Sequence, residues 1–118
     1  MKYCSFVLLL VLTACSHNSG DMHKWQASDI VGYNLKLIDK TAHESFTFSA
    51  DGLVAASIGS VGGPVAAPLW YWEIDKEGFL IIKDEKEIIY RMKKLYDKNG
   101  IIGVEYAGHK VEYEKHKR

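Results

Sequence analysis

Apolar and polar side chains alternate along short segments of the chain. In the stretch ESFTFS, Phe46 and Phe48 alternate with small polar residues. Alternation with a period of two, bounded by turn residues, is typical of β-strands. Segments of this kind predict eight strands, at residues 33–38, 44–49, 53–58, 70–75, 79–84, 87–97, 101–107 and 110–115.

Short turn sequences separate most of these segments. Asp51-Gly52 and Asn99-Gly100 supply the positive φ angles that tight hairpin turns require. Strands joined by hairpins in sequence form an antiparallel meander, and such a sheet must protect its two edges. We therefore predict an all-β fold in which about eight short strands close into a small barrel or a folded-over sandwich.

Two segments allow a helix. Residues 86–96 include Ile88, Ile89, Met92 and Leu95 at helical spacing, although isoleucine and tyrosine favour a strand. The strand interpretation places Met92 and Tyr96 on one face and Lys93 on the other. The stretch WQASDIV, residues 25–31, predicts a single helical turn that plugs one end of the sheet.

The N-terminal residues have the features of a secretory signal. Lys2 precedes an apolar core at Phe6–Leu12, which is too short to span a bilayer. The motif Leu12-Thr13-Ala14-Cys15 resembles the lipobox of bacterial lipoproteins, which implies cleavage before Cys15 and acylation of its thiol. The predicted organisation is a signal peptide at 1–14, a lipidated cysteine with a polar tether at 15–24, and one β domain at 25–118.

The lipobox resemblance also implies a location. Ser16 follows Cys15, where an aspartate would signal retention in the inner membrane, so an outer-membrane anchor facing the periplasm is expected. The resemblance also implies that Cys15 carries three acyl chains, which is more than the two signals that stable anchoring needs. The tether Ser16–Lys24 reaches about 30 Å when fully extended, so the domain can stand clear of the membrane surface.

The strand pattern has a resemblance of its own. Phe46-Thr47-Phe48 followed by Asp51-Gly52, and then Trp70-Tyr71-Trp72-Glu73-Ile74, resembles small lipocalin-like bacterial lipoproteins. The resemblance implies a barrel whose interior is filled by side chains or holds one small ligand. Gly32-Tyr33-Asn34 departs from the Gly-x-Trp motif that opens the first strand of lipocalins, which counts against ligand carriage.

Cysteine content and charge exclude several classes of protein. The chain has two cysteines, of which Cys4 leaves with the signal and Cys15 carries lipid. No thiol remains for a disulfide, a metal site or a nucleophile. Without Lys2 the chain has 14 basic and 15 acidic side chains, a formal charge of about −1. No strong field would attract nucleic acid.

The search for catalytic chemistry finds no convergent set. The histidines do not pair at metal-ligand spacing, and GSVGGP lacks the lysine and the following helix of a phosphate loop. His43 and Glu44 form a lone adjacent acid–base pair. We therefore expect no enzymatic activity, no metal and no cofactor.

The stretch GSVGGPVAAPL, residues 59–69, interrupts the pattern of charged turns. Long loops on rigid scaffolds are where binding sites concentrate. Its apolar residues predict either a lid over the barrel or a surface presented to a partner. Next to this stretch, Trp70 and Trp72 share a strand face with Ile74. Either both tryptophans are core residues, or Trp70 lines the mouth of the barrel. The candidate binding residues are Val61, Pro64, Val65, Pro68, Leu69 and Trp70.

These features predict a non-catalytic binding module for another envelope protein, acting as an inhibitor, immunity factor or assembly accessory. The alternative is a carrier or sensor of a small apolar ligand such as a lipid. An enclosed apolar cavity above about 300 Å³ would favour the ligand. A filled barrel, with bulky residues such as Phe46 and Tyr90 inside, would favour the protein partner.

Overall fold

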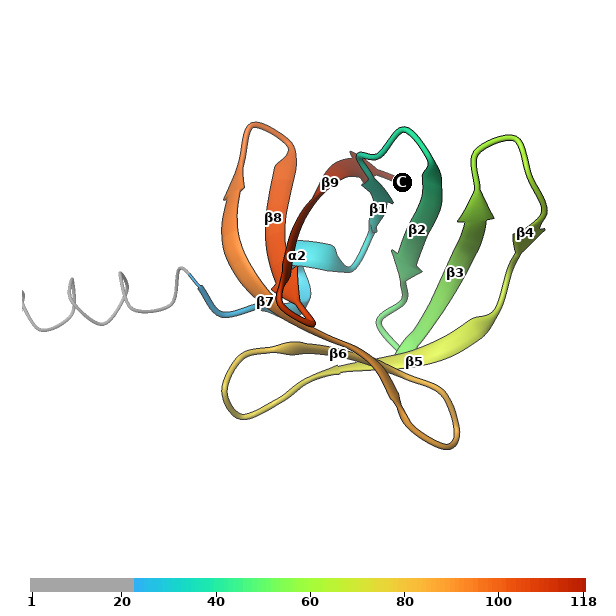
Figure 1. The fold of residues 1–118 in the computed structure, drawn as a ribbon. Coiled ribbons are helices and arrows are strands. Elements are labelled where there is room, and N and C mark those ends of the chain that lie inside the picture. Colours follow the sequence, from blue (N-terminus) through green and yellow to red (C-terminus); the bar gives the residue numbers. More distant parts are fainter. Residues whose placement is uncertain (1–22) are drawn as a thin grey trace, which may run out of the picture.

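The computed structural model describes residues 23–118, which form an all-β barrel with one short helix (Figure 1). Every predicted segment contains a strand, and β4 is an additional two-residue strand within the 59–69 stretch. The elements are α2 (Ala27–Ile30), β1 (Tyr33–Leu37), β2 (Ala42–Phe48), β3 (Leu53–Ser60), β4 (Val65–Ala66), β5 (Leu69–Ile74), β6 (Leu80–Lys83), β7 (Ile88–Lys98), β8 (Ile101–Tyr106) and β9 (His109–Lys117).

Antiparallel pairing closes the sheet into a barrel rather than a sandwich. The strands follow the order β2-β1-β9-β8-β7-β6-β5-β3-β4, and β2 also pairs with β3. That last pairing runs from Ala42↔Ser60 to Phe48↔Val54 and joins the two sides of the sheet. Eight strands make the ring, while β4 continues the β5 side of β3. Closure removes the edge problem that a meander has.

The barrel interior is filled by the inward residues of the alternating strands. Phe46 and Phe48 are completely buried. The ring of Phe48 meets that of Trp72 edge-on at 5.8 Å between centroids, and Phe46 meets Tyr90 in the same way at 5.4 Å. Edge-to-face pairs of this kind add to the free energy gained from burial alone. The prediction that these bulky residues fill the barrel is confirmed.

The helix α2 lies inside the ring of strands and plugs one end of the barrel (Figure 1). Ile30 is completely buried, and Trp25 is 2% exposed. The indole N–H of Trp25 donates to the Met92 carbonyl at 3.0 Å. Asp29 pairs with the ammonium group of Lys94 at 3.0 Å. The predicted helical turn over 25–31 is confirmed, and an ion pair holds it to β7.

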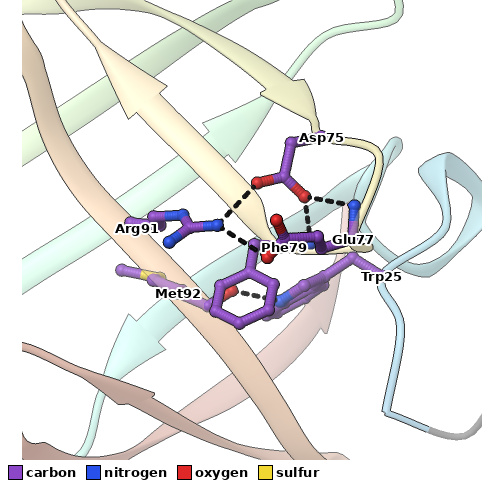
Figure 2. Close-up of polar contacts among 6 residues, drawn as sticks. All are labelled: Trp25, Asp75, Glu77, Phe79, Arg91 and Met92. Carbon is purple, nitrogen blue, oxygen red and sulfur yellow. Dashed lines mark hydrogen bonds and ion pairs between the residues drawn. The ribbon is translucent and has the colours of Figure 1, made fainter.

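A network at the β5–β6 turn holds the chain where it enters the barrel (Figure 2). Asp75 accepts backbone N–H bonds from Glu77 and Phe79, each at 2.9 Å. These bonds, with the Arg91 guanidinium, hold the pKa of Asp75 below its usual value. Arg91 bonds Asp75 at 3.2 Å and Glu77 at 3.0 Å, and it lies 4.4 Å from the ring centroid of Phe79. The turn therefore has a fixed shape.

The fixed turn receives the chain just before α2. The backbone N–H of Trp25 donates to the Gly78 carbonyl at 2.9 Å. Gly78 has a φ of 88°, and a Cβ there would lie 2.6 Å from the Lys24 side chain. Glycine is required here by both the backbone angle and the close approach of the two segments.

Residues 88–98 form the strand β7, so the helical alternative for 86–96 is wrong. One detail of the predicted faces is also wrong. Lys94 continues the inward face of Met92, and a bulge between Lys94 and Tyr96 then shifts the register, so that Tyr96 lies on the outer face beside Gly103. There the Tyr96 hydroxyl donates to Glu112. A bulge adds one residue and reverses the faces that follow it.

Candidate functional site

The 59–69 stretch forms a hairpin that continues β3, and we call these residues the rim hairpin. Ile58 pairs with Ala66 and Gly59 with Val65, which makes the two-residue strand β4. The turn closes with a bond from the N–H of Gly63 to the Ser60 carbonyl at 3.0 Å. The stretch is therefore an ordered β-structure rather than an irregular loop.

Two contacts fix the position of the rim hairpin on the barrel. The N–H of Val61 donates to the Thr41 carbonyl at 2.9 Å, which ties the tip to the β1–β2 turn. At its base the Pro68 carbonyl accepts a bond from the N–H of Ala56 at 3.0 Å. Gly59 allows the close approach, because a Cβ there would lie 2.4 Å from the Pro64 carbonyl oxygen. The hairpin is held by its backbone.

The side chains of the rim hairpin face solvent. Val61 is 61% exposed, Val65 51% and Leu69 63%, and Pro64 is exposed as well. Pro68 is half-buried. The lid alternative is therefore wrong, because a lid would bury these residues against the barrel. The arrangement is the other alternative, an apolar surface on an ordered support.

Trp70 is separated from the other candidate residues because it points into the barrel. The strand β5 alternates between exposed and half-buried residues, with Trp70, Trp72 and Ile74 packed against the core. The Trp70 ring lies 6.3 Å from the ring of Tyr90. Tyr71, its neighbour, is 41% exposed on the outer face. Tyr71 therefore extends the apolar surface of the rim hairpin, and Trp70 does not.

A hollow of about 370 Å³ lies beside the rim hairpin, between it and the β1–β2 turn. Its walls include Lys36, Asp39 and His43 together with residues 60–63 and Val65. The His43 ring bonds the Ser57 hydroxyl on the outer face at 2.9 Å. Glu44, the next residue along the strand, points inward, so His43 and Glu44 do not converge as an acid–base pair.

A polar cluster inside the barrel is the feature that the sequence reasoning missed. Glu44 accepts a hydrogen bond from the Tyr113 hydroxyl, and another from the Tyr90 hydroxyl at 3.1 Å. The Tyr106 ring packs edge-on against Tyr90 at 5.2 Å. We call Glu44, Tyr90, Tyr106 and Tyr113 the tyrosine cluster. The signal was present, since Glu44 has the same parity as Phe46 and Phe48 in an alternating strand.

The hydroxyls of the tyrosine cluster are held in the protonated form. Burial and then the Glu44 carboxylate raise the pKa of Tyr113 and of Tyr90 far above the usual tyrosine value. The same two causes raise the pKa of Tyr106. Both effects disfavour a phenolate beside a carboxylate. The hydroxyls of Tyr90 and Tyr113 therefore act as hydrogen-bond donors to Glu44 over the whole neutral range.

The described residues offer surface hollows and no metal cluster. Residues 23–118 contain no group of three His, Cys, Asp or Glu side chains placed to hold a metal ion. Each hollow described in this part of the chain opens to solvent at the rim or on the outer surface. No helix among the same residues has the length and apolar character needed to cross a bilayer. The predicted lipidation site, Cys15, lies outside the described residues.

The fold and site define a closed, eight-stranded antiparallel barrel with a filled interior, compatible with the lipocalin-like barrel expected from the sequence. Comparison with protein-family models, with curated proteins and with solved structures found no match.

Proposed function

We propose that this chain is a lipid-anchored protein of the bacterial envelope that binds another envelope protein through the rim hairpin, without catalysis. The observation that carries the proposal is the exposure of Val61, Val65 and Leu69 on an ordered, projecting hairpin. Its role would be that of an inhibitor, an immunity factor or an assembly accessory.

The exposed side chains represent free energy that a partner can recover. Complete burial of a valine or leucine side chain contributes about 1.5–3 kcal/mol. Val61, Val65, Leu69 and Tyr71 continue from the hairpin tip onto the outer face of β5. The backbone contacts to Thr41 and Ala56 hold the hairpin in place before binding, so little conformational entropy is lost on docking.

The prolines favour docking by side chains over the addition of a strand. An extended peptide that joins a sheet edge needs a continuous row of backbone donors and acceptors. Pro64 and Pro68 have no N–H, and prolines on an edge discourage strand pairing. The partner would therefore bury the apolar face of the rim hairpin instead of extending the sheet.

The alternative of a carrier for a small apolar ligand has less support. Phe46, Phe48, Trp72 and Tyr90 occupy the space in which a barrel carrier would hold its ligand. Catalysis also lacks support, because His43 and Glu44 lie on opposite faces of β2. Both facts favour the outer surface of the rim hairpin for the proposed docking.

The anchor is part of the proposal. The lipobox at Leu12–Cys15 would place lipid at Cys15, and Ser16 would direct the protein to the periplasmic face of the outer membrane. The tether 16–24 then leads to Lys24 and Trp25, at the end of the barrel that α2 plugs. Val31, just after α2, bridges to Phe48 at the carboxyl end of β2. Because β3 is antiparallel to β2, the rim hairpin at the carboxyl end of β3 lies at the other end of the barrel.

Envelope co-purification with a charged variant tests the proposal. Val65→Asp places a charge in the centre of the exposed surface, and it should abolish recovery of the partner while the far-UV spectrum and thermal midpoint stay unchanged. Ile38→Asp is the matched control, since Ile38 is also exposed, at 44%, but lines a groove on another side of the barrel. It should retain the partner.

Two results would reject this assignment. If the Val65→Asp protein recovers the same partner in the same amount as wild type, the binding site lies elsewhere. If Val65→Asp unfolds the domain, the rim hairpin is part of the core and its apolar residues need no partner.

A further inference from the structure

The tyrosine cluster lies at the end of the barrel opposite α2. Glu44 is near the start of β2, Tyr90 near the start of β7, and Tyr106 is the last residue of β8. In a closed antiparallel sheet these three positions belong to the same end. Val31, the residue after α2, bridges to Phe48 at the end of β2, so α2 belongs to the other end. The unplugged end is therefore lined by the tyrosine cluster.

Solvent reaches this end of the barrel. Glu44, Tyr90, Tyr106 and Trp70 are each half-buried, whereas Tyr113 beneath them is completely buried. Glu44 therefore lies where the filled core meets solvent, with aromatic residues half-buried at the same end. Each carboxylate oxygen accepts one tyrosine bond and keeps a further lone pair for another donor.

The negative charge of Glu44 has no positive partner within the described structure. None of the ion pairs formed by residues 23–118 includes Glu44. The inward-facing charge of Lys94, by contrast, is paired with Asp29 and belongs to the α2 end. A half-buried carboxylate with only neutral hydroxyl donors retains its full attraction for a cation.

Three aromatic rings pack against one another, and one of them, Tyr90, bonds the same carboxylate. The ring of Tyr90 lies 5.2 Å from that of Tyr106 and 6.3 Å from that of Trp70, measured between centroids. Tryptophan and tyrosine rings attract ammonium groups through their quadrupole, and rings gathered around a cation are the usual means of recognising quaternary and alkylated amines. A carboxylate at the base of such rings adds a counter-charge.

We propose that the unplugged end of the barrel binds an organic ammonium group, with Glu44 as its counter-ion and the rings of Trp70, Tyr90 and Tyr106 around it. The ligand class is a primary or quaternary alkylammonium ion. A divalent metal would require several carboxylates or histidines, and the described residues provide one. An anion would be repelled by Glu44. This site is distinct from the outer surface of the rim hairpin and does not depend on it.

Saturation-transfer NMR on the purified full-length protein in a nonionic detergent tests the proposal. The probes are n-butylammonium chloride and its uncharged analogue n-butanol, titrated at constant ionic strength. We expect a saturable signal from butylammonium and none from butanol. Tetramethylammonium chloride distinguishes a preference for quaternary ions from a preference for primary amines. If butylammonium and tetramethylammonium both fail to saturate, or if butanol binds as well as butylammonium, the proposal is wrong.

A pair of isosteric variants locates the site. Glu44→Gln removes the charge and keeps an acceptor, and it should weaken butylammonium binding by about tenfold or more. Glu112→Gln is the matched control, because Glu112 also accepts a tyrosine hydroxyl bond, from Tyr96, but on the outer face. It should bind as wild type does. Equal affinity in the two variants would overturn the assignment, and the comparison of charged and uncharged probes on wild type stands even if Glu44→Gln does not fold.

Discussion

Truncation of Phe48 is the sharpest test of how the barrel is held together. Phe48 is completely buried. Its ring packs edge-on against Trp72 at 5.8 Å and at a tilt against Phe46 at 6.1 Å, measured between ring centroids. Its backbone also forms the bridge to Val31, just after α2. Phe48→Ala therefore opens a cavity at the junction between the core and the helical plug.

The expected loss follows from the size of that cavity. Truncation of a buried phenylalanine costs about 3–5 kcal/mol in free energy of unfolding. A domain of about 95 residues has about 5–14 kcal/mol in total, so the variant loses about a fifth or more of its stability. The thermal midpoint should fall by about 12 °C or more.

The assay is urea denaturation followed by tryptophan fluorescence and far-UV circular dichroism. The same substitution at Phe79 is the control, because Phe79 is half-buried on the outer surface under Arg91. Phe79→Ala should cost about 1–2 kcal/mol, from partial burial and a cation–π contact. Equal denaturation midpoints for the two variants, at equal denaturant dependence, would contradict the inward position of Phe48 and the register of β2.

Three further perturbations test other parts of the structure. Asp29→Asn leaves the buried Lys94 without its counter-ion, whereas Lys94→Met removes the buried charge itself. The free energy of unfolding, measured by urea denaturation, should therefore fall more in Asp29→Asn than in Lys94→Met, and the reverse order would contradict this. Cys15→Ser should leave the protein unprocessed or release it from the membrane fraction, and a cleaved variant that still sediments with membranes would rule out the lipobox. Backbone N–H bonds lower the pKa of Asp75 in the folded state, so its contribution to stability is complete above the unfolded pKa of about 3.9 and is lost as the pH falls below it. Asp75→Asn should therefore flatten the decline of the thermal midpoint between about pH 4.5 and 2.5, and an unchanged slope would show that the turn does not contribute.

The strands were predictable because local signals agreed with one another. Asn99 and Gly100 have φ angles of 55° and 77°, as a two-residue hairpin turn requires, and the flanking segments alternate in register. The longer β2–β3 turn also contains a glycine with a positive φ, Gly52 at 91°, and its flanking strands alternate in register. Where turn chemistry and alternation coincide, a few neighbouring residues determine the structure.

The parts that sequence reasoning missed depend on contacts between distant segments. The strand β4 forms because Gly59 lets Pro64 approach and because Thr41 binds the N–H of Val61, and neither contact has a local signature. The bulge before Tyr96 likewise depends on how β7 passes from β6 to β8. Local alternation cannot report where a strand changes partners.

Alternation along the strands could have predicted that Glu44 and Lys94 face inward. It could not have predicted which groups each of them contacts. Both lie on the core face of their strands, yet the structure gives Lys94 a carboxylate partner from α2 and gives Glu44 only tyrosine hydroxyls. The difference arises because α2 supplies Asp29 at one end of the barrel, whereas at the other end the described residues give Glu44 hydroxyl partners and no ion pair. Lys94, which is paired with Asp29, belongs to the end where the chain enters. Glu44, which has no ion pair among the described residues, belongs to the end that carries the rim hairpin. Under the proposed function, attachment and recognition lie at opposite ends of the barrel, because the chain enters at the α2 end and the other end presents the apolar surface and the Glu44 carboxylate.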